Sequence, residues 1–166
     1  MADYKKLKPF ILKWEGGYAS NIDGAICSMK GITLATFRAY YGKNKNCKDL
    51  KNITDSQWDM IFIDKFWDRW SANNINSQSI ANLLVDWLWN CGKYGITYPQ
   101  KVLGVKVDGI VGNKTIAAIN NYPNQEELFN KLWNSRKNYY ISIAKGNKKK
   151  FLNGWLNRLN EIKWED

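Results

Sequence analysis

The chain has 166 residues, of which 45% are hydrophobic, and it carries a formal net charge of +10. This length fits one compact domain or two tightly packed lobes, and the hydrophobic content is too high for a disordered chain. The absence of histidine excludes Ser-His-Asp and Cys-His catalysis and also histidine-based zinc sites. The positive charge favours a polyanionic partner, such as nucleic acid, anionic lipid or bacterial cell wall, without choosing among them.

The three cysteines, Cys27, Cys47 and Cys91, are widely spaced and odd in number. We therefore expect no disulfide framework, and a reduced cytosolic environment is the default. No apolar signal-peptide segment follows Met1, and no apolar run reaches the ~20 residues of a membrane span. The expectation is a protein made in the cytoplasm without a signal peptide or an integral membrane segment. Any action on the cell wall would then follow export or release.

Apolar residues at helical spacing between Leu7 and Trp14 predict a first helix that ends near Glu15. Pro9 belongs in the first turn of this helix, or it kinks a longer one. Residues 18–32 show no helical period and predict a loop or a short, irregular hairpin. This segment is where we expect whatever strands the protein has.

The rest of the chain predicts helices. Thr54 and Gln57 form a capping box, and Thr33 and Asn124 are further candidate caps. The expected helices cover residues 33–42, 54–70, 78–91, 98–103, 113–120 and 124–146, with a final helix after residue 150. Because the strand signal is weak everywhere, the predicted fold is all-α or nearly so.

Glu15 is the first candidate for chemistry, because it lies at the end of an apolar helical face and directly after Trp14. A carboxyl held against apolar neighbours is disfavoured in its ionised form, so it can remain protonated and donate a proton. Gly16 and Gly17 follow and allow close approach of backbone or substrate. The residue alone also fits a solvated side chain at a helix end.

The wider sequence resembles a known family. Glu15-Gly16-Gly17-Tyr18, followed by Gly31-Ile32-Thr33, resembles the N-terminal signature of glycoside hydrolase family 108, the bacterial and phage N-acetylmuramidases. Further similarities follow in the family's order: Phe66-Trp67-Asp68, Asp86 with Asn90 and Gly92, Gln100, Asp108-Gly109, and the closing motif Phe151-Leu152-Asn153-Gly154-Trp155-Leu156-Asn157-Arg158. The resemblance covers nearly the whole chain.

The resemblance implies a lysozyme-like, two-lobed helical fold with a small irregular or β-hairpin segment near residues 16–32. It implies an N-acetylmuramidase-like catalytic region over residues 1–94. A helical, peptidoglycan-binding-like region over residues 95–166 would pack on it as one compact unit. The implied reaction is hydrolysis of the β-1,4 bond between N-acetylmuramic acid and N-acetylglucosamine. The expected partner is peptidoglycan, with no nucleic acid, no cofactor and no metal, and we expect a monomer.

The resemblance makes Glu15 the catalytic acid, and glycoside hydrolysis ordinarily needs a second carboxyl. Asp23 is the best candidate by position, although it also fits a turn residue before Gly24. The family's loop usually reads Asp-Pro-Gly-Gly-x-Thr-Asn. Here Asp23 can stand for the Asp and Ser28 for the Thr, while the Pro, one Gly and the Asn are absent.

Asp86 is the next carboxylate candidate, with an alternative structural role in holding the loop of Glu15 through hydrogen bonds. Tyr18 and Thr33 either orient water or sugar, or they serve as loop packing and a helix cap. The full set of predicted substrate-binding residues is Tyr18, Ser28, Thr33, Asp86 and Asn90.

Three rival functions remain open at this point. The first is a catalytically inactive lysozyme-like protein that binds the wall or regulates secretion, which the altered loop at residues 23–29 allows. The second is a lytic transglycosylase, which can also work with a single Glu. The third is a nucleic-acid-binding module, suggested by charge and aromatic content but supported by no recognised motif.

Overall fold

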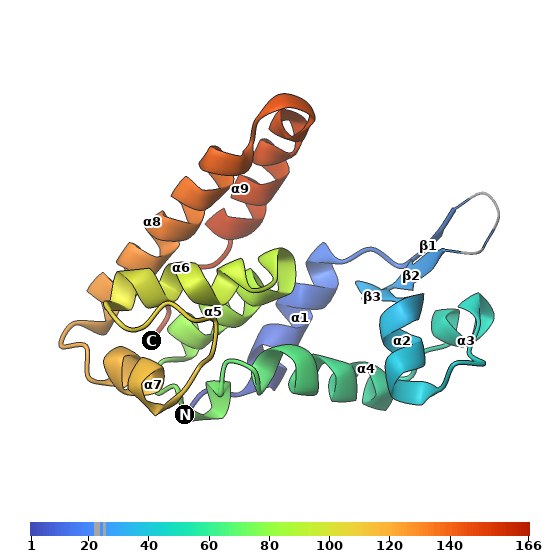
Figure 1. Ribbon diagram of the computed structural model, residues 1–166, viewed down its shortest axis with the longest axis horizontal. Helices are drawn as coiled ribbons and strands as arrows, with labels where there is room; N and C mark the ends of the chain where they lie inside the picture. Colours follow the sequence, from blue (N-terminus) through green and yellow to red (C-terminus); the bar gives the residue numbers. More distant parts are fainter. Residues whose placement is uncertain (22–23, 25) are drawn as a thin grey trace. The chain divides into compact units, whose positions relative to one another are not determined.

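The computed structural model describes residues 1–21, 24 and 26–166 (Figure 1). The chain forms two compact units: residues 4–65, here called the N-terminal unit, and residues 66–166 with residues 1–3, here called the C-terminal unit. Within the described residues, none of the helices is both long enough and apolar enough to cross a membrane.

The N-terminal unit contains short helices and a small sheet. Its elements are α1 (Tyr4–Trp14), β1 (Tyr18–Ser20), β2 (Cys27–Met29), β3 (Ile32–Thr33), α2 (Leu34–Tyr41), α3 (Cys47–Lys51) and α4 (Asp55–Phe62), and a π-helical turn, η1 (Ile63–Trp67), leads out of the unit. The sheet is antiparallel in the order β1-β2-β3. The irregular hairpin predicted over residues 18–32 is therefore present as a short three-stranded sheet.

Side-chain caps fix where these helices begin. The Thr33 hydroxyl accepts a hydrogen bond from the backbone N–H of Thr36 at 3.2 Å and caps α2. At α4, the Thr54 hydroxyl accepts from the Gln57 N–H at 3.1 Å, and the Gln57 side chain accepts from the Thr54 N–H at 3.0 Å. Both starts agree with the sequence-based prediction, because each cap satisfies backbone donors that a helix start leaves unpaired. Pro9 lies in the middle of α1 and not in its first turn.

The expectation of three separate thiols is wrong for two of them, because Cys27 and Cys47 form a disulfide. Cys27 lies on β2, and Cys47 is the first residue of α3. The fold brings these two elements together, with a Cα–Cα distance of 6.0 Å that suits a disulfide. Helix α3 was itself not predicted, so no local pattern indicated that the two cysteines would meet. Cys91 has a free thiol.

The described elements of the C-terminal unit are all helices, joined by loops. Its elements are η2 (Ala72–Asn74), α5 (Gln78–Cys91), α6 (Tyr94–Leu103), α7 (Asn113–Asn120), α8 (Gln125–Ile143), η3 (Gly146–Phe151) and α9 (Leu152–Asn160). Helices α8 and α9 lie side by side as a hairpin, with η3 at its turn (Figure 1). Helix α6 begins at Tyr94, four residues before its predicted start.

Helix α5 forms the centre of this unit's core. The four apolar residues predicted on one of its faces are fully buried: Ile80, Leu83, Leu84 and Trp87. Helix α6 crosses it closely at Gly95, where a Cβ atom would lie only 2.4 Å from the backbone nitrogen of Leu88. Only glycine permits this approach, so Gly95 sets the spacing of the two helices.

Candidate active site

Glu15 lies directly after the last residue of α1. Its backbone N–H donates to the Ile11 carbonyl at 3.0 Å, so the final helical turn still fixes its main chain. Its side chain is partly buried. Gly16 and Gly17 follow on the surface, and a Cβ atom on either would meet nothing within 4 Å. The backbone next to Glu15 is therefore open to approach.

The sheet places the predicted substrate-binding residues Tyr18, Ser28 and Thr33 on two different faces. Ser28 pairs with both Ala19 and Thr33, so these three side chains share one face of the sheet. Tyr18 pairs with Met29 and belongs to the opposite face. The structure thus brings Ser28 and Thr33 together and places Tyr18 away from them.

Tyr18 has a clear contact on its own face of the sheet. The Lys51 ammonium lies 5.4 Å from the centroid of the Tyr18 ring, within the range of a cation–π interaction. This contact ties β1 to α3. It agrees with the packing alternative predicted for Tyr18, because it accounts for the ring without a ligand.

Ser28 and Thr33 line a groove of about 530 Å³ within the N-terminal unit. Asn21 and Arg38 also line it, and neither was predicted as a site residue. Asp23 lies outside the described residues. Its described neighbours are ordered by the Asn21 side chain, whose oxygen accepts from the Ile26 N–H at 3.1 Å. Asn21 and Ile26, which this hydrogen bond joins, both line the groove.

Asp86 occupies a different environment, in the core of the C-terminal unit. It lies on α5 and its side chain is completely buried. One carboxylate oxygen lies 2.6 Å from an Arg136 nitrogen on α8, and the other lies 2.6 Å from an Arg158 nitrogen on α9. Both oxygens are therefore held by guanidinium groups, and the carboxylate joins three helices.

The fully buried Arg136 is satisfied on all sides. Its guanidinium donates to the Tyr140 hydroxyl at 2.9 Å and to the Leu83 carbonyl at 3.2 Å, in addition to Asp86. Burial is the largest single influence and lowers the pKa of Arg136, but Asp86 and Tyr140, through charge and hydrogen bonds, together outweigh it and leave the pKa raised. Arg136 therefore stays charged in the core.

Asn90 lies at the surface edge of the same cluster. With its amide oxygen turned toward the arginines, it accepts from Arg136 at 3.1 Å and from Arg158 at 3.3 Å. Asp86 has no exposed surface with which to meet a ligand, whereas Asn90 is exposed. The partners of Asp86 are arginines of α8 and α9, so this geometry favours a structural role, although not the predicted one of bonding directly to the loop of Glu15. Neither arginine was identified from the sequence, although Arg158 lies in the closing motif.

The motif around Asp108 and Gly109 also has a structural explanation. The buried Gln100 side chain donates to Asp108 at 3.2 Å and to the Ile110 carbonyl at 3.0 Å, and it accepts from the Gly109 N–H at 2.9 Å. Gly109 has a φ of +72°, which favours glycine. Gln100 thus holds the turn that leads toward α7.

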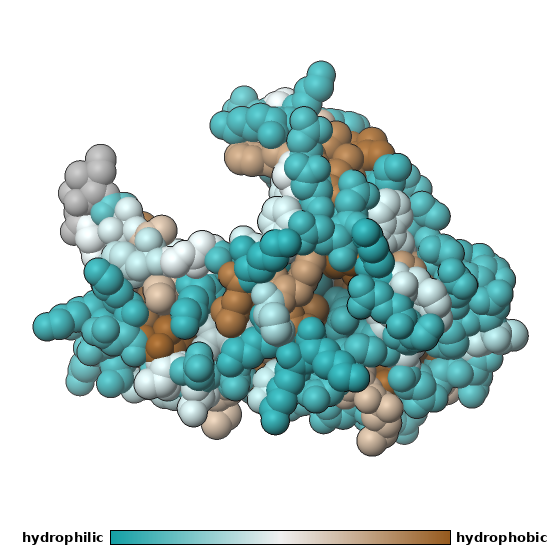
Figure 2. Space-filling view, turned by 180° about the vertical axis from the view of Figure 1, so that it is seen from behind, coloured by the Kyte–Doolittle hydropathy of each residue, from teal (hydrophilic) through white to brown (hydrophobic). Residues whose placement is uncertain are grey.

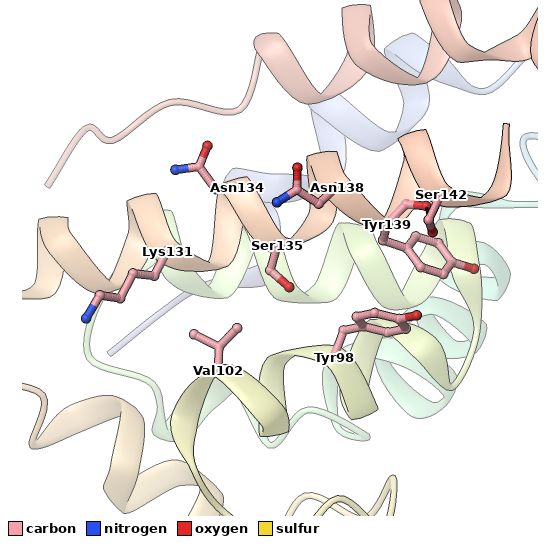
Figure 3. Close-up of a pocket in the computed structure, with 8 residues that line it drawn as sticks. All are labelled: Tyr98, Val102, Lys131, Asn134, Ser135, Asn138, Tyr139 and Ser142. Carbon is pink, nitrogen blue, oxygen red and sulfur yellow. Dashed lines mark hydrogen bonds between the residues drawn. The ribbon is translucent and has the colours of Figure 1, made fainter.

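A second groove, of about 620 Å³, lies between α6 and α8 (Figure 3). Tyr98 and Tyr139 meet at one end of it, and Lys131 lies at the other. Within the described part of the chain, no group of three or more Cys, Asp or Glu residues is arranged to hold a metal ion.

Residues 8–92 match the family described as Glycosyl hydrolase 108. The chain belongs to the glycosyl hydrolase 108 family. Residues 94–160 match a second family, described as Predicted Peptidoglycan domain. Together the two matches support glycoside hydrolase activity with peptidoglycan as the substrate, and hence action on the cell wall. A search of curated proteins gave no significant match.

The solved structure of SagA from Brucella abortus is similar to this family 108 protein over 96% of the present chain and 90% of SagA. The TM-score is 0.80 and the sequence identity is 25%. The prediction of a nearly all-α, lysozyme-like fold with one small sheet is confirmed.

Proposed function

We propose that the protein hydrolyses the β-1,4 bond between N-acetylmuramic acid and N-acetylglucosamine, with Glu15 as the general acid. The observation that carries this proposal is the placement of Glu15. It lies at the end of α1, inside the family 108 match, with two exposed glycines directly after it. A carboxylic acid placed there can protonate the leaving glycosidic oxygen while the sugar passes over the open backbone.

The second group of the reaction is proposed to be Asp23, acting as base or nucleophile. Its support is its place in the sequence between Asn21 and Ile26, which both line the groove together with Ser28 and Thr33. If Asp23 has no such role, a hydroxyl from Ser28 or Thr33 would have to place the water. Thr33 already uses its hydroxyl to cap α2, so Ser28 is the better hydroxyl candidate. Tyr18 and Asn90 remain proposed substrate contacts.

Exchange of Glu15→Gln tests the acid. Glutamine is nearly isosteric and cannot donate the proton, so lysis of purified sacculi should fall ~10²–10⁴-fold. Circular dichroism and the melting temperature should not change. A well-folded Glu15→Gln protein that clears sacculi at the normal rate would show that another residue is the acid. If the unaltered protein also fails to clear sacculi, the rival function as an inactive wall-binding or secretion-linked protein is favoured.

Exchange of Asp23→Asn tests the second group. If Asp23 activates water or attacks the sugar, neutralising it should reduce lysis nearly as far as Glu15→Gln does. Ser28→Ala serves as the comparison, because it removes the competing hydroxyl from the same groove. Full activity of Asp23→Asn together with an inactive Ser28→Ala would transfer the role to Ser28.

Mass spectrometry of digested peptidoglycan identifies the reaction itself. A muramidase leaves reducing N-acetylmuramic acid ends, whereas a lytic transglycosylase leaves anhydro ends. Reducing N-acetylglucosamine ends would show that a different bond is cut. The same digest therefore decides between the proposed hydrolysis and its nearest alternatives.

The site of action is proposed to lie outside the cytoplasm, after export or release. The Cys27–Cys47 disulfide supports this, because disulfides persist in oxidising environments and are rare in the cytosol. The enzyme is proposed to act as a monomer and without nucleic acid. The division into a catalytic region, residues 1–94, and a wall-binding-like region, residues 95–166, stays a prediction.

A further inference from the structure

We propose that the groove between α6 and α8 binds a segment of N-acetylated glycan strand. This inference rests on the proposed function, since both assign the same polymer, and it adds a saccharide site built only from the C-terminal unit. The groove volume of about 620 Å³ lies in the range of small-ligand sites. In Figure 3, Tyr98 and Val102 extend from α6, and Ser135 points toward them from α8.

One end of the groove has an aromatic wall. The rings of Tyr98 and Tyr139 lie edge to face with centroids 4.9 Å apart, and the Tyr139 side chain is fixed by burial. The Tyr98 ring also contacts Trp87 and Tyr94, and the flexible, exposed Lys101 side chain covers a further part of it, with the ammonium 4.8 Å from the ring centre. A sugar can displace Lys101 and pack its C–H face against the wall, because aromatic rings bury large apolar areas.

The α8 side of the groove carries unused hydrogen-bonding groups. Asn134, Ser135 and Asn138 lie along it (Figure 3). Among the residues that the structure describes, none accepts from or donates to these three side chains. A side-chain amide offers two donors and one acceptor, which is the complement of an acetamido group flanked by hydroxyls. The spacing along α8 therefore suits a ligand rich in amides and hydroxyls.

The charge of the groove favours a neutral ligand. No carboxylate is among its described lining residues, and the lining cation, Lys131, pairs with Glu127 at 2.9 Å and donates to the Tyr122 hydroxyl at 2.6 Å. Lys101, a second cation, lies over the Tyr98 ring and is the side chain that the sugar would displace. A groove for a phosphate polymer or nucleic acid would need cations that are not already neutralised. The lining instead matches uncharged N-acetylated sugar.

The test is a nuclear magnetic resonance titration of the Glu15→Gln protein with the tetramer of N-acetylglucosamine, which this variant should not cleave. The side-chain amide signals of Asn134 and Asn138 should shift. Exchange of Asn138→Ala should weaken binding at the groove about fivefold, the effect of about one lost hydrogen bond. Asn157→Ala on α9 is the matched control and should have no effect, because Asn157 is exposed and does not line the groove.

A second variant, Ser135→Trp, fills the groove and should abolish the shifts at Asn134 and Asn138. The proposal fails if the tetramer shifts signals of the N-terminal unit alone, or if Asn138→Ala binds as tightly as Asn157→Ala does. Either result leaves the catalytic assignment standing, because lysis by the unaltered protein and its loss in Glu15→Gln are measured separately.

A different observation carries a second proposal, at the end of the α8–α9 hairpin. We infer that this end, residues 141–151 and here called the basic tip, binds anionic lipid membranes. The chain has no Asp or Glu from residue 128 to residue 160, a stretch that includes the cations Lys131, Arg136, Lys137, Lys145, Lys148, Lys149, Lys150 and Arg158. Four of these lysines lie in the tip and are exposed.

Apolar side chains lie among these lysines. Ile141 is 48% exposed and Phe151 is 49% exposed. Figure 2 shows brown apolar surface at the end of the hairpin beside teal hydrophilic surface. Within the described part of the chain, Lys145, Lys148 and Lys149 form no ion pair. Exposed apolar groups beside lysines without ion pairs favour a lipid surface over a fully hydrated polyanion. An anionic bilayer attracts the lysines and also buries the apolar side chains, whereas a hydrated polyanion only attracts the lysines.

The test is sedimentation of the full protein with mixed phosphatidylcholine and phosphatidylglycerol vesicles, against phosphatidylcholine vesicles alone. Binding should require the anionic lipid and weaken with salt. The variant Lys148→Gln with Lys149→Gln should weaken it by about tenfold or more. Lys106→Gln with Lys114→Gln is the charge-matched control, since both residues are exposed but lie outside the tip.

The apolar part of the tip is tested by Phe151→Ser against Ile110→Ser. Ile110 is 70% exposed, more than Phe151, so its variant removes at least as much exposed apolar surface elsewhere in the unit. Phe151→Ser alone should reduce vesicle binding. The proposal is overturned if anionic vesicles do not sediment the protein, or if both serine variants bind alike. Tip-dependent binding to sacculi without vesicle binding would identify a wall polymer as the partner instead.

Discussion

Glu15 in the N-terminal unit and Asp86 in the C-terminal unit are both carboxylates in motifs of the same family, yet they differ in burial. Glu15 lies at a helix end beside exposed glycines, whereas Asp86 is buried with each oxygen 2.6 Å from an arginine. A fully buried carboxylate whose two oxygens both bind guanidinium groups has no exposed surface with which to meet a substrate. The comparison shows that two carboxylates of one family signature can have very different surroundings.

The largest stability effect that sharpens this comparison is expected at Asp86. Exchange of Asp86→Asn leaves Arg136 and Arg158 without their carboxylate in the core. Removing one partner of a buried ion pair typically costs about 3–5 kcal/mol of unfolding free energy. Urea denaturation measures the loss, and Asp68→Asn, at an exposed position of the same unit, should have almost no effect.

A loss of lysis without a loss of stability would give Asp86 a role in the reaction. If Asp86→Asn keeps its unfolding free energy but no longer clears sacculi, Asp86 takes part in the reaction. If instead lysis recovers at low temperature, where the destabilised variant is folded, its role is structural.

The sequence was sufficient to predict most helices, because their signals are local. The capping box of Thr54 and Gln57 and the cap at Asn124 both appear in the structure. Helix α3 has the same kind of signal, since Asn46 and Asp49 cap each other's backbone, but it is only five residues long and lacks an apolar period. Short helices of this kind are easily missed.

The features that could not be predicted depend on contacts between distant residues. Arg136 lies 50 positions from Asp86 and Arg158 lies 72 positions from it. Neither spacing has a local period, so no sequence pattern indicates that α8 and α9 converge on α5. The family membership was predictable because the signature that begins at Glu15 is contiguous.

The next largest effect is expected from the disulfide of the N-terminal unit. The Cys27→Ser and Cys47→Ser double variant removes a link across 20 residues, which should cost about 3 kcal/mol of unfolding free energy in the chain-entropy account. The C-terminal unit has no disulfide among its described residues, so Cys91→Ser is the matched control. Thermal melts with and without reductant measure the difference.

The disulfide also adjoins the groove of the N-terminal unit. Because β2 carries both Cys27 and Ser28, loss of the link should disturb the groove as well as the stability. Reductant should then slow lysis by the unaltered protein more than lysis by the double variant. Equal sensitivity of the two proteins would place the effect of reductant elsewhere.

The smallest stability effect is expected at Gly17, where it separates fold from function. A Cβ atom at Gly17 meets nothing within 4 Å, and no left-handed φ is present there, so Gly17→Ala should fold normally and change the unfolding free energy by about 1 kcal/mol or less. Gly95→Ala is the contrasting variant, because its Cβ atom would lie 2.4 Å from the backbone nitrogen of Leu88.

Gly17→Ala also tests whether the sugar approaches over this glycine. If the protein needs glycine beside Glu15 only for the approach of the sugar, Gly17→Ala should lose lysis while its melting temperature stays nearly constant. Gly112→Ala, at an equally open position of the C-terminal unit, should keep both. Normal lysis by Gly17→Ala would show that the open backbone after Glu15 is not where the substrate passes, and the reacting sugar would then have to reach Glu15 from another side.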